Sequence, residues 1–169
     1  MARICVSLPT LAAVCVACAL AAPLAAKDSL GIYDSWGAFR DASVPRCYAI
    51  ALARPTRASR DYEPYASVGT WPKRQVRNQL HLRLSRTLSE TPRIVLRIDG
   101  KRFDLTGGGG DAWAQDKRMD AAIVATMRSA QRMTVTARDD RGRSFSDTYE
   151  LLGAATAMDA ATLGCAKLK

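Results

Sequence analysis

The sequence predicts a mainly β protein, an antiparallel β-sandwich or open barrel with one packed α-helix and a short C-terminal helix. Short segments in which apolar and polar residues alternate are typical of strands with one buried face, and they outnumber the helix-like segments. Hairpin-length turns rather than helical crossovers connect these segments, which favours antiparallel pairing. A ferredoxin-like α+β sheet is the alternative fold.

The first 26 residues have the pattern of a secretory signal peptide. One positive charge, Arg3, precedes an apolar stretch that is short for crossing a bilayer, and small residues follow it. We expect cleavage between Ala21 and Ala26, which leaves residues 27–169 as one mature domain without a membrane-spanning segment. The expected location is therefore the periplasm or the cell surface, with a retained membrane anchor as the alternative.

The cysteines divide between this leader and the mature domain. Cleavage removes Cys5, Cys15 and Cys18 and leaves only Cys47 and Cys165. An even pair in an oxidising compartment predicts one disulfide, here between an early strand and the C-terminal helix. The alternative is an envelope lipoprotein in which Cys18 is lipid-modified.

The first part of the mature chain contains three expected strands. Leu30–Phe39 and Arg46–Ala53 have the composition of short strands and are separated by a turn at 43–45. Arg54–Pro64 mixes proline with charges and has no period, so it is expected to be a loop. Tyr65–Trp71 is the third strand.

The middle of the chain has the clearest strand signals. In Val76–Arg86, the apolar residues alternate with Arg77, Gln79, His81 and Arg83, which predicts a half-buried strand. In Arg93–Thr106, the dipeptide Asp99-Gly100 separates two alternating runs. Asp-Gly in this position predicts a hairpin, because a type I′ turn requires positive φ at both central residues.

The residue composition changes after Gly107–Gly110, and we interpret these four glycines as a flexible break. An amphipathic helix is expected from about Asp120, because apolar residues recur there at helical spacing. Arg132–Arg138 and Arg143–Leu152 then predict a second hairpin, and the alanine-rich tail predicts the short helix that carries Cys165.

Few residues in this sequence are typical of catalysis or of metal and cofactor binding. His81 is the single histidine and lies on the polar side of a strand, so we interpret it as a surface residue. No zinc or calcium motif is present, and no lysine follows the glycine run as in a phosphate-binding loop, so no cofactor is predicted. Trp36, Trp71 and Trp113 are expected to be packing residues in the core or at its rim, with the lining of a ligand cleft as the alternative.

The positive charge is more informative, because it is concentrated between Lys73 and Arg102. This band contains nine cations and two carboxylates. If the two central strands pair with each other, Arg77, Arg83, Arg93 and Arg97 project from one outer face, which would attract anionic envelope lipids or glycans. A solvated face without a partner is the other interpretation. Nucleic acid is not expected in the predicted compartment, and a protein partner stays open.

Several segments, read in order, resemble the invasion-associated-locus-B family of bacterial envelope proteins. The segments are WGAF at Trp36, the Cys47 strand, IVLRIDGKRF, and the stretch from Asp120 to Ala160 with its tail Leu152 to Asp159. Where that family carries a cysteine pair before the helix, this chain has GGGGDAW. The resemblance implies an exported protein without an established enzymatic activity.

We therefore expect a non-enzymatic envelope protein, and more specifically one that acts as an interaction module. A periplasmic hydrolase that uses a serine or an aspartate is the alternative. A catalytic Ser-Lys pair has no fixed spacing in a sequence, so its absence does not follow from the pattern of this chain.

Overall fold

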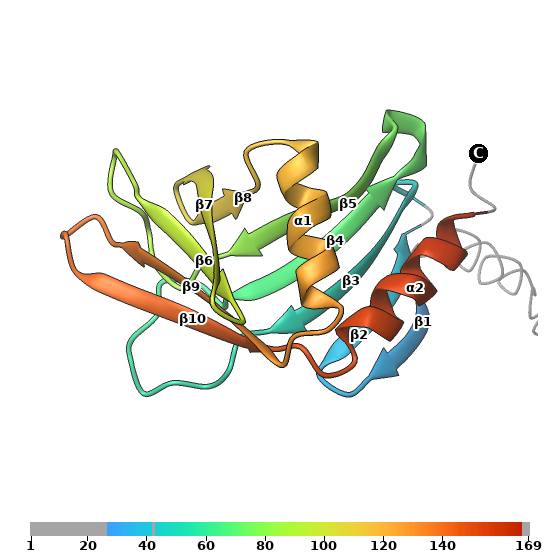
Figure 1. The fold of residues 1–169 in the computed structure, drawn as a ribbon, viewed down its shortest axis with the longest axis horizontal. Helices are drawn as coiled ribbons and strands as arrows, with labels where there is room; N and C mark the ends of the chain where they lie inside the picture. Colours follow the sequence, from blue (N-terminus) through green and yellow to red (C-terminus); the bar gives the residue numbers. More distant parts are fainter. Residues whose placement is uncertain (1–26, 42, 167–169) are drawn as a thin grey trace, which may run out of the picture.

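The computed structural model describes residues 27–41 and 43–166. In this part of the chain, ten strands form one antiparallel sheet that does not close, and two helices pack against it (Figure 1). The predicted fold class, mainly β with an open sheet and two helices, is confirmed. The predicted leader, residues 1–26, lies outside the described residues.

The elements follow each other along the chain in short steps. The strands and helices are β1 (Asp28–Tyr33), β2 (Trp36–Asp41), β3 (Arg46–Leu52), β4 (Tyr65–Trp71), β5 (Val76–Arg83), β6 (Ile94–Ile98), β7 (Lys101–Gly108), β8 (Asp111–Trp113), α1 (Lys117–Met127), β9 (Arg132–Arg138), β10 (Ser144–Glu150) and α2 (Ala154–Cys165). A 3₁₀ turn, Pro72–Arg74, connects β4 to β5. Neither helix among the described residues is long and apolar enough to cross a bilayer.

Local turn chemistry explains where the strands end. Asp99 and Gly100 have φ values of 44° and 79°, as the predicted hairpin requires. The expected single strand Leu30–Phe39 is wrong, because Asp34, at φ 50°, reverses the chain between β1 and β2. The expected flexible break at Gly107–Gly110 is also wrong, because these residues end β7 and turn into β8.

Helix α1 begins three residues before its expected start at Asp120. Asp116 has an extended backbone and its carboxylate accepts a hydrogen bond from Met119 N at 2.7 Å, so it caps the first turn. A side-chain acceptor at this position satisfies one of the free N–H groups of the helix start, which fixes the boundary.

The strand order is β1-β2-β3-β4-β5-β8-β7-β6-β9-β10, and β7 is the point where the sheet curls. Lys101–Leu105 pairs with β6, whereas Thr106–Gly108 pairs with β8. The curl brings distant segments together, because the Asp147 carboxylate in β10 accepts a hydrogen bond from Ser85 N at 2.9 Å. The pairing of β5 with β6 that the sequence suggested is wrong, since β8 and β7 lie between them.

The two edges of the open sheet are β1 and β10. The pairing of β1 with β2 shifts register between Ser29 and Gly31, so this edge carries a bulge. The other edge is partly covered, because Arg54 N donates a hydrogen bond to Thr148 O at 2.8 Å.

The core lies between the inner face of the sheet and the two helices, which Figure 1 shows on the same side of the sheet. Helix α2 packs against β1, β2 and β3, and α1 packs against β5 and β6. Trp36 is fully buried, as expected of a packing residue, and its Nε1 donates to Glu150 O at 2.8 Å. Arg128 and Asp159 join the two helices through an ion pair of 2.6 Å.

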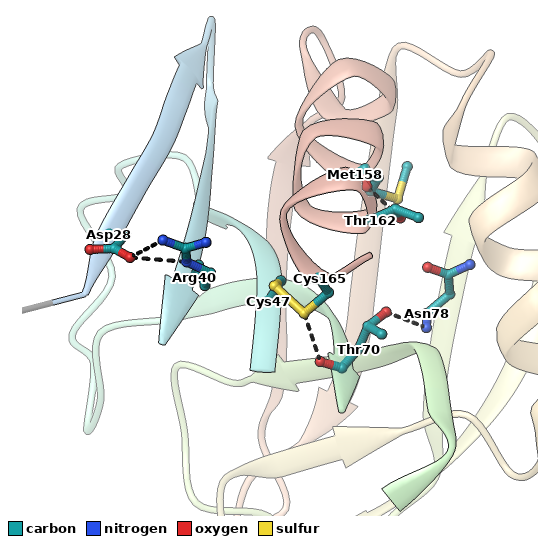
Figure 2. The surroundings of a disulfide bond; sticks show 8 residues. All are labelled: Asp28, Arg40, Cys47, Thr70, Asn78, Met158, Thr162 and Cys165. Atoms are coloured by element: carbon teal, nitrogen blue, oxygen red, sulfur yellow. Dashed lines mark hydrogen bonds and ion pairs between the residues drawn. A yellow bond between two sulfur atoms is a disulfide. The ribbon is translucent and has the colours of Figure 1, made fainter. Parts of the chain in front are cut away.

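A disulfide joins Cys47 of β3 to Cys165 of α2, as predicted (Figure 2). The two Cα atoms are 5.7 Å apart, and 118 residues separate the cysteines in the sequence. Both side chains are buried. The bridge therefore fixes the last helix to the inner face of the sheet near its first strands.

Gly153 makes the closest backbone approach in this region, directly before α2. Its φ is +86°, and a Cβ built on it would collide with the carbonyl oxygen of Tyr33 in the β1–β2 hairpin. Gly142, in the β9–β10 turn, has a similar φ of +76° but no atom within 4 Å of the same position.

We expect Gly153→Ala to destabilise the protein strongly, whereas Gly142→Ala serves as the matched control. The control adds only the left-handed backbone penalty, about 1–2 kcal/mol. Gly153→Ala adds a clash of the kind that costs about 1–3 kcal/mol more. Thermal and urea unfolding of both variants measure this difference, and equal destabilisation would contradict the close approach.

We expect the double substitution Cys47→Ala with Cys165→Ala to lower the free energy of unfolding by up to about 4 kcal/mol. The reason is that a bridge across so long a loop restricts the unfolded chain. Reductant should lower the melting temperature of the wild type and leave the double variant unchanged. A wild type that is insensitive to reductant would show that the bridge does not form.

Candidate functional site

Aromatic side chains gather on the outer face of β3, β4, β5 and β8, opposite the helices. Alternation along these strands places small or aliphatic residues inside, such as Ala49 and Leu80, which are fully buried. The residues that face outward are half-buried and include large rings: Tyr48, Tyr65, Trp71, His81 and Trp113. Rings on the solvent side of a sheet are not required by the core, so they point to another role.

A hydrogen-bonded cluster occupies one end of this face. His81 Nε2 lies 2.9 Å from Asp111 Oδ1, and Arg83 Nη1 donates to Asp111 Oδ2 at 2.6 Å. The His81 and Asp111 side chains are 22% and 26% exposed. Strand register explains the contact, because His81 and Arg83 of β5 lie opposite Trp113 and Asp111 of β8.

Aromatic packing holds the cluster in place. The His81 ring stacks on Trp113 at a centroid distance of 5.3 Å and meets the edge of Tyr65 at 5.5 Å. The Arg83 guanidinium lies 3.7 Å from the centroid of Tyr62, a cation–π contact. The cluster is therefore preorganised by rings on both sides.

A second group of rings lies over the middle of β3 and β4. Phe39 stacks on Tyr48 at 5.7 Å, and the Arg46 guanidinium lies 4.8 Å from the Tyr48 ring. The far edge of the Trp71 indole lies over Gly69, in the space that a Cβ would need. Only glycine at this position lets the indole approach the strand so closely.

Between these groups lies an open groove of about 390 Å³. Rings and polar groups alternate around it, and the polar groups include Lys27, Arg46, Ser67 and Gln79. Concave surfaces of this size that mix aromatic walls with a few polar groups are typical of ligand sites.

The groove shows no hydrogen-bonded pair of nucleophile and base among the described residues. Ser67 lies opposite His81 in the sheet register, and Asp111 contacts the same histidine. Within the described residues, however, no hydrogen bond joins the Ser67 hydroxyl to His81, and the neighbouring backbone belongs to paired strands. N–H groups committed to the ladder are not free to form an oxyanion hole, so its donors would have to be side chains such as the Gln79 amide.

Metal coordination has no candidate among the residues that the structure describes. No group of three or more His, Cys, Asp or Glu side chains converges there.

The four arginines of the predicted anion-binding face do not share one face. A bulge at Asn78, with φ 53°, shifts the register of β5 against β4, so Arg77 lines a hollow on the side of α2 together with Thr162. Arg83 lies on the outer face and is paired with Asp111.

The other two predicted arginines lie in the second half of the sheet. Arg97 is exposed on β6 opposite Arg102 of β7, and Arg93 precedes the same strand. Both act electrostatically on Asp104 and, with Arg102 as the main cause, hold the pKa of that carboxyl below its usual value. The structure thus brings Arg93 and Arg97 together and separates them from Arg77 and Arg83.

The aromatic groove is a feature for which the sequence favoured the other interpretation, packing. Trp71 and Trp113, expected to be packing residues, line the groove, whereas Trp36 does lie in the core. A signal was present, because Tyr48 and His81 fall on the outward side of strands with clear alternation. The register that brings them together comes from the folded sheet alone.

Comparison of the chain with models of known protein families, with curated proteins and with solved structures finds no match.

Asp120 of α1 forms a hydrogen bond to the backbone of β5, one of the strands that carry the groove. Strand β8 pairs with β5 only from His81 to Arg83. The N–H group of the preceding residue, Leu80, donates instead to the Asp120 carboxylate at 2.8 Å. Burial raises the pKa of Asp120 above its usual value, although the hydrogen bond from Leu80 opposes this. The ionised form is thus less favourable in the folded state than in the unfolded state.

We expect Asp120→Asn to raise the free energy of unfolding at neutral pH, because the amide oxygen still accepts from Leu80 and no charge is buried. A raised carboxyl pKa gives stability that is complete below the unfolded value, about 4, and is lost as pH rises through the folded pKa. The loss between pH 4 and pH 7 should therefore be smaller in the variant. Urea unfolding across this range measures it, with exposed Asp34→Asn as control. A steeper loss in Asp120→Asn would contradict the argument.

Proposed function

We propose that this chain is a non-enzymatic, exported protein of the bacterial cell envelope and that the outer aromatic groove is its ligand-binding site. The observation that carries the proposal is the concentration of large rings and cations on the sheet face that the helices leave uncovered. The hydrophobic core does not require these rings on the outer face, whereas contact with a ligand would explain their position.

Export has two independent supports. The first 26 residues have the charge and hydropathy pattern of a cleaved signal peptide. The Cys47–Cys165 bridge joins two buried cysteines, and structural disulfides persist in oxidising compartments such as the periplasm. The resemblance to the invasion-associated-locus-B family favours the same location.

Binding is favoured over catalysis by how the titratable groups are used. The Asp111 carboxylate is shared between His81 and Arg83, so it acts as a structural anchor of the outer face. The backbone beneath the groove is engaged in sheet pairing, which leaves no N–H pair to stabilise a developing negative charge.

We expect the full chain, produced with its own leader in a Gram-negative bacterium, to appear in the periplasmic fraction and to bind isolated cell envelopes through the groove. Mass spectrometry should place the mature N-terminus between residues 22 and 27, without a lipid. Trp71→Ala should reduce co-sedimentation with envelopes severalfold, because it removes one wall of the groove.

Leu163→Ala is the matched control. It also removes a large apolar side chain from the surface, because Leu163 of α2 is 73% exposed, but it lies outside the groove. Circular dichroism should show both variants folded. A cytoplasmic product would overturn export, a mature N-terminus at lipid-modified Cys18 would establish the lipoprotein alternative, and equal binding of the two variants would overturn the role of the groove.

A further inference from the structure

We propose that the groove binds an acidic oligosaccharide, with Arg46 holding a sugar carboxylate and the rings of Tyr48, Trp71 and Trp113 packing against the sugar faces. The inference rests on the proposed function, because it names the ligand class of the same groove. Four observations carry it: the state of Arg46, the rings, the unpartnered polar groups and the sign of the charge.

Arg46 retains hydrogen-bonding capacity. Its side chain is 33% exposed, and among the described residues the guanidinium forms one long ion pair, from Nη2 to Asp41 Oδ2 at 3.5 Å, and no hydrogen bond. The other oxygen of that carboxylate, Oδ1, accepts from the Ser43 hydroxyl at 2.7 Å and from Val44 N at 3.2 Å, so Asp41 is shared among three partners. The guanidinium also lies over Tyr48, so it is fixed in direction and presents donors to a ligand carboxylate.

The rings fit the apolar side of a sugar. A pyranose has a face of C–H groups and a rim of hydroxyl groups, and an aromatic ring gains from covering such an apolar face. Trp71 from β4 and Trp113 from β8 line one groove, and Trp113 is held by its stack on His81. Rings fixed on rigid strands contact a ligand with little loss of side-chain freedom.

Polar side chains in the groove match the hydroxyl rim. The Ser67 hydroxyl and the Gln79 amide line the groove, and neither has a hydrogen-bond partner among the described residues. An amide and a hydroxyl donate and accept together, as neighbouring sugar hydroxyls do.

The charge of the lining favours an acidic sugar over a neutral one. Lys27 and Arg46 line the groove, and no carboxylate among the described residues does so. A neutral sugar would leave the Arg46 guanidinium with only its 3.5 Å ion pair to Asp41 as counter-charge.

The test is calorimetric titration of the purified mature protein with tetragalacturonate, and with cellotetraose as an uncharged probe of similar length. We expect tetragalacturonate to bind more tightly, with an affinity that falls as salt rises. Arg46→Gln should weaken binding about tenfold or more, the effect of one charged hydrogen-bonding group. Trp71→Ala should lower the affinity for both sugars.

Arg97→Gln is the matched control, because it removes the same charge from an exposed position on β6, outside the groove. It should change the affinity less than about twofold, since distant exposed charges are screened. Equal weakening by Arg46→Gln and Arg97→Gln, or equal binding of the two sugars, would overturn the proposal. Binding of a thymidine oligonucleotide or of anionic vesicles in place of tetragalacturonate, lost in Trp71→Ala, would overturn the ligand class and leave the binding function standing.

Discussion

The arrangement of this protein depends on the contact between α2 and the inner face of the first strands. That interface is built of small side chains, including Ala38 and Ala49 on the sheet and Ala157 and Ala161 on the helix, all of them buried. Small residues let the helix approach closely, but each buries little apolar surface. The disulfide compensates, because it ties the helix covalently to the strand on which it lies.

Placing both helices on one side leaves the other side of the sheet with no structural partner from the described chain. Antiparallel sheets tolerate one solvated face, and that face ordinarily carries short polar or charged side chains. Here it carries Trp71, Trp113 and their neighbours over a hollow. The buried core lies on the inner face with the helices, so the rings of the outer face lie outside it.

Local pattern and chemistry could be predicted from the sequence, whereas strand neighbours could not. The bounds of β4 and β9, the Asp99-Gly100 turn and the cysteine bridge all follow from short-range signals. The neighbour of β5 does not, because β8 has three residues and is too short to give a period. The bulge at Asn78 moves Arg77 to the other face, and nothing in the alternation marks it. The groove depends on these non-local features, so it appears only in the folded chain.

An open sheet exposes two edges, and exposed edges are templates on which further strands assemble. The register shift between Ser29 and Gly31 makes the β1 edge irregular, and the contact of Arg54 N with Thr148 O occupies part of the other edge. Both features interrupt the regular row of donors and acceptors that a strand from a second molecule would need. The sheet can therefore stay open while neither edge offers a second molecule a regular strand to pair with.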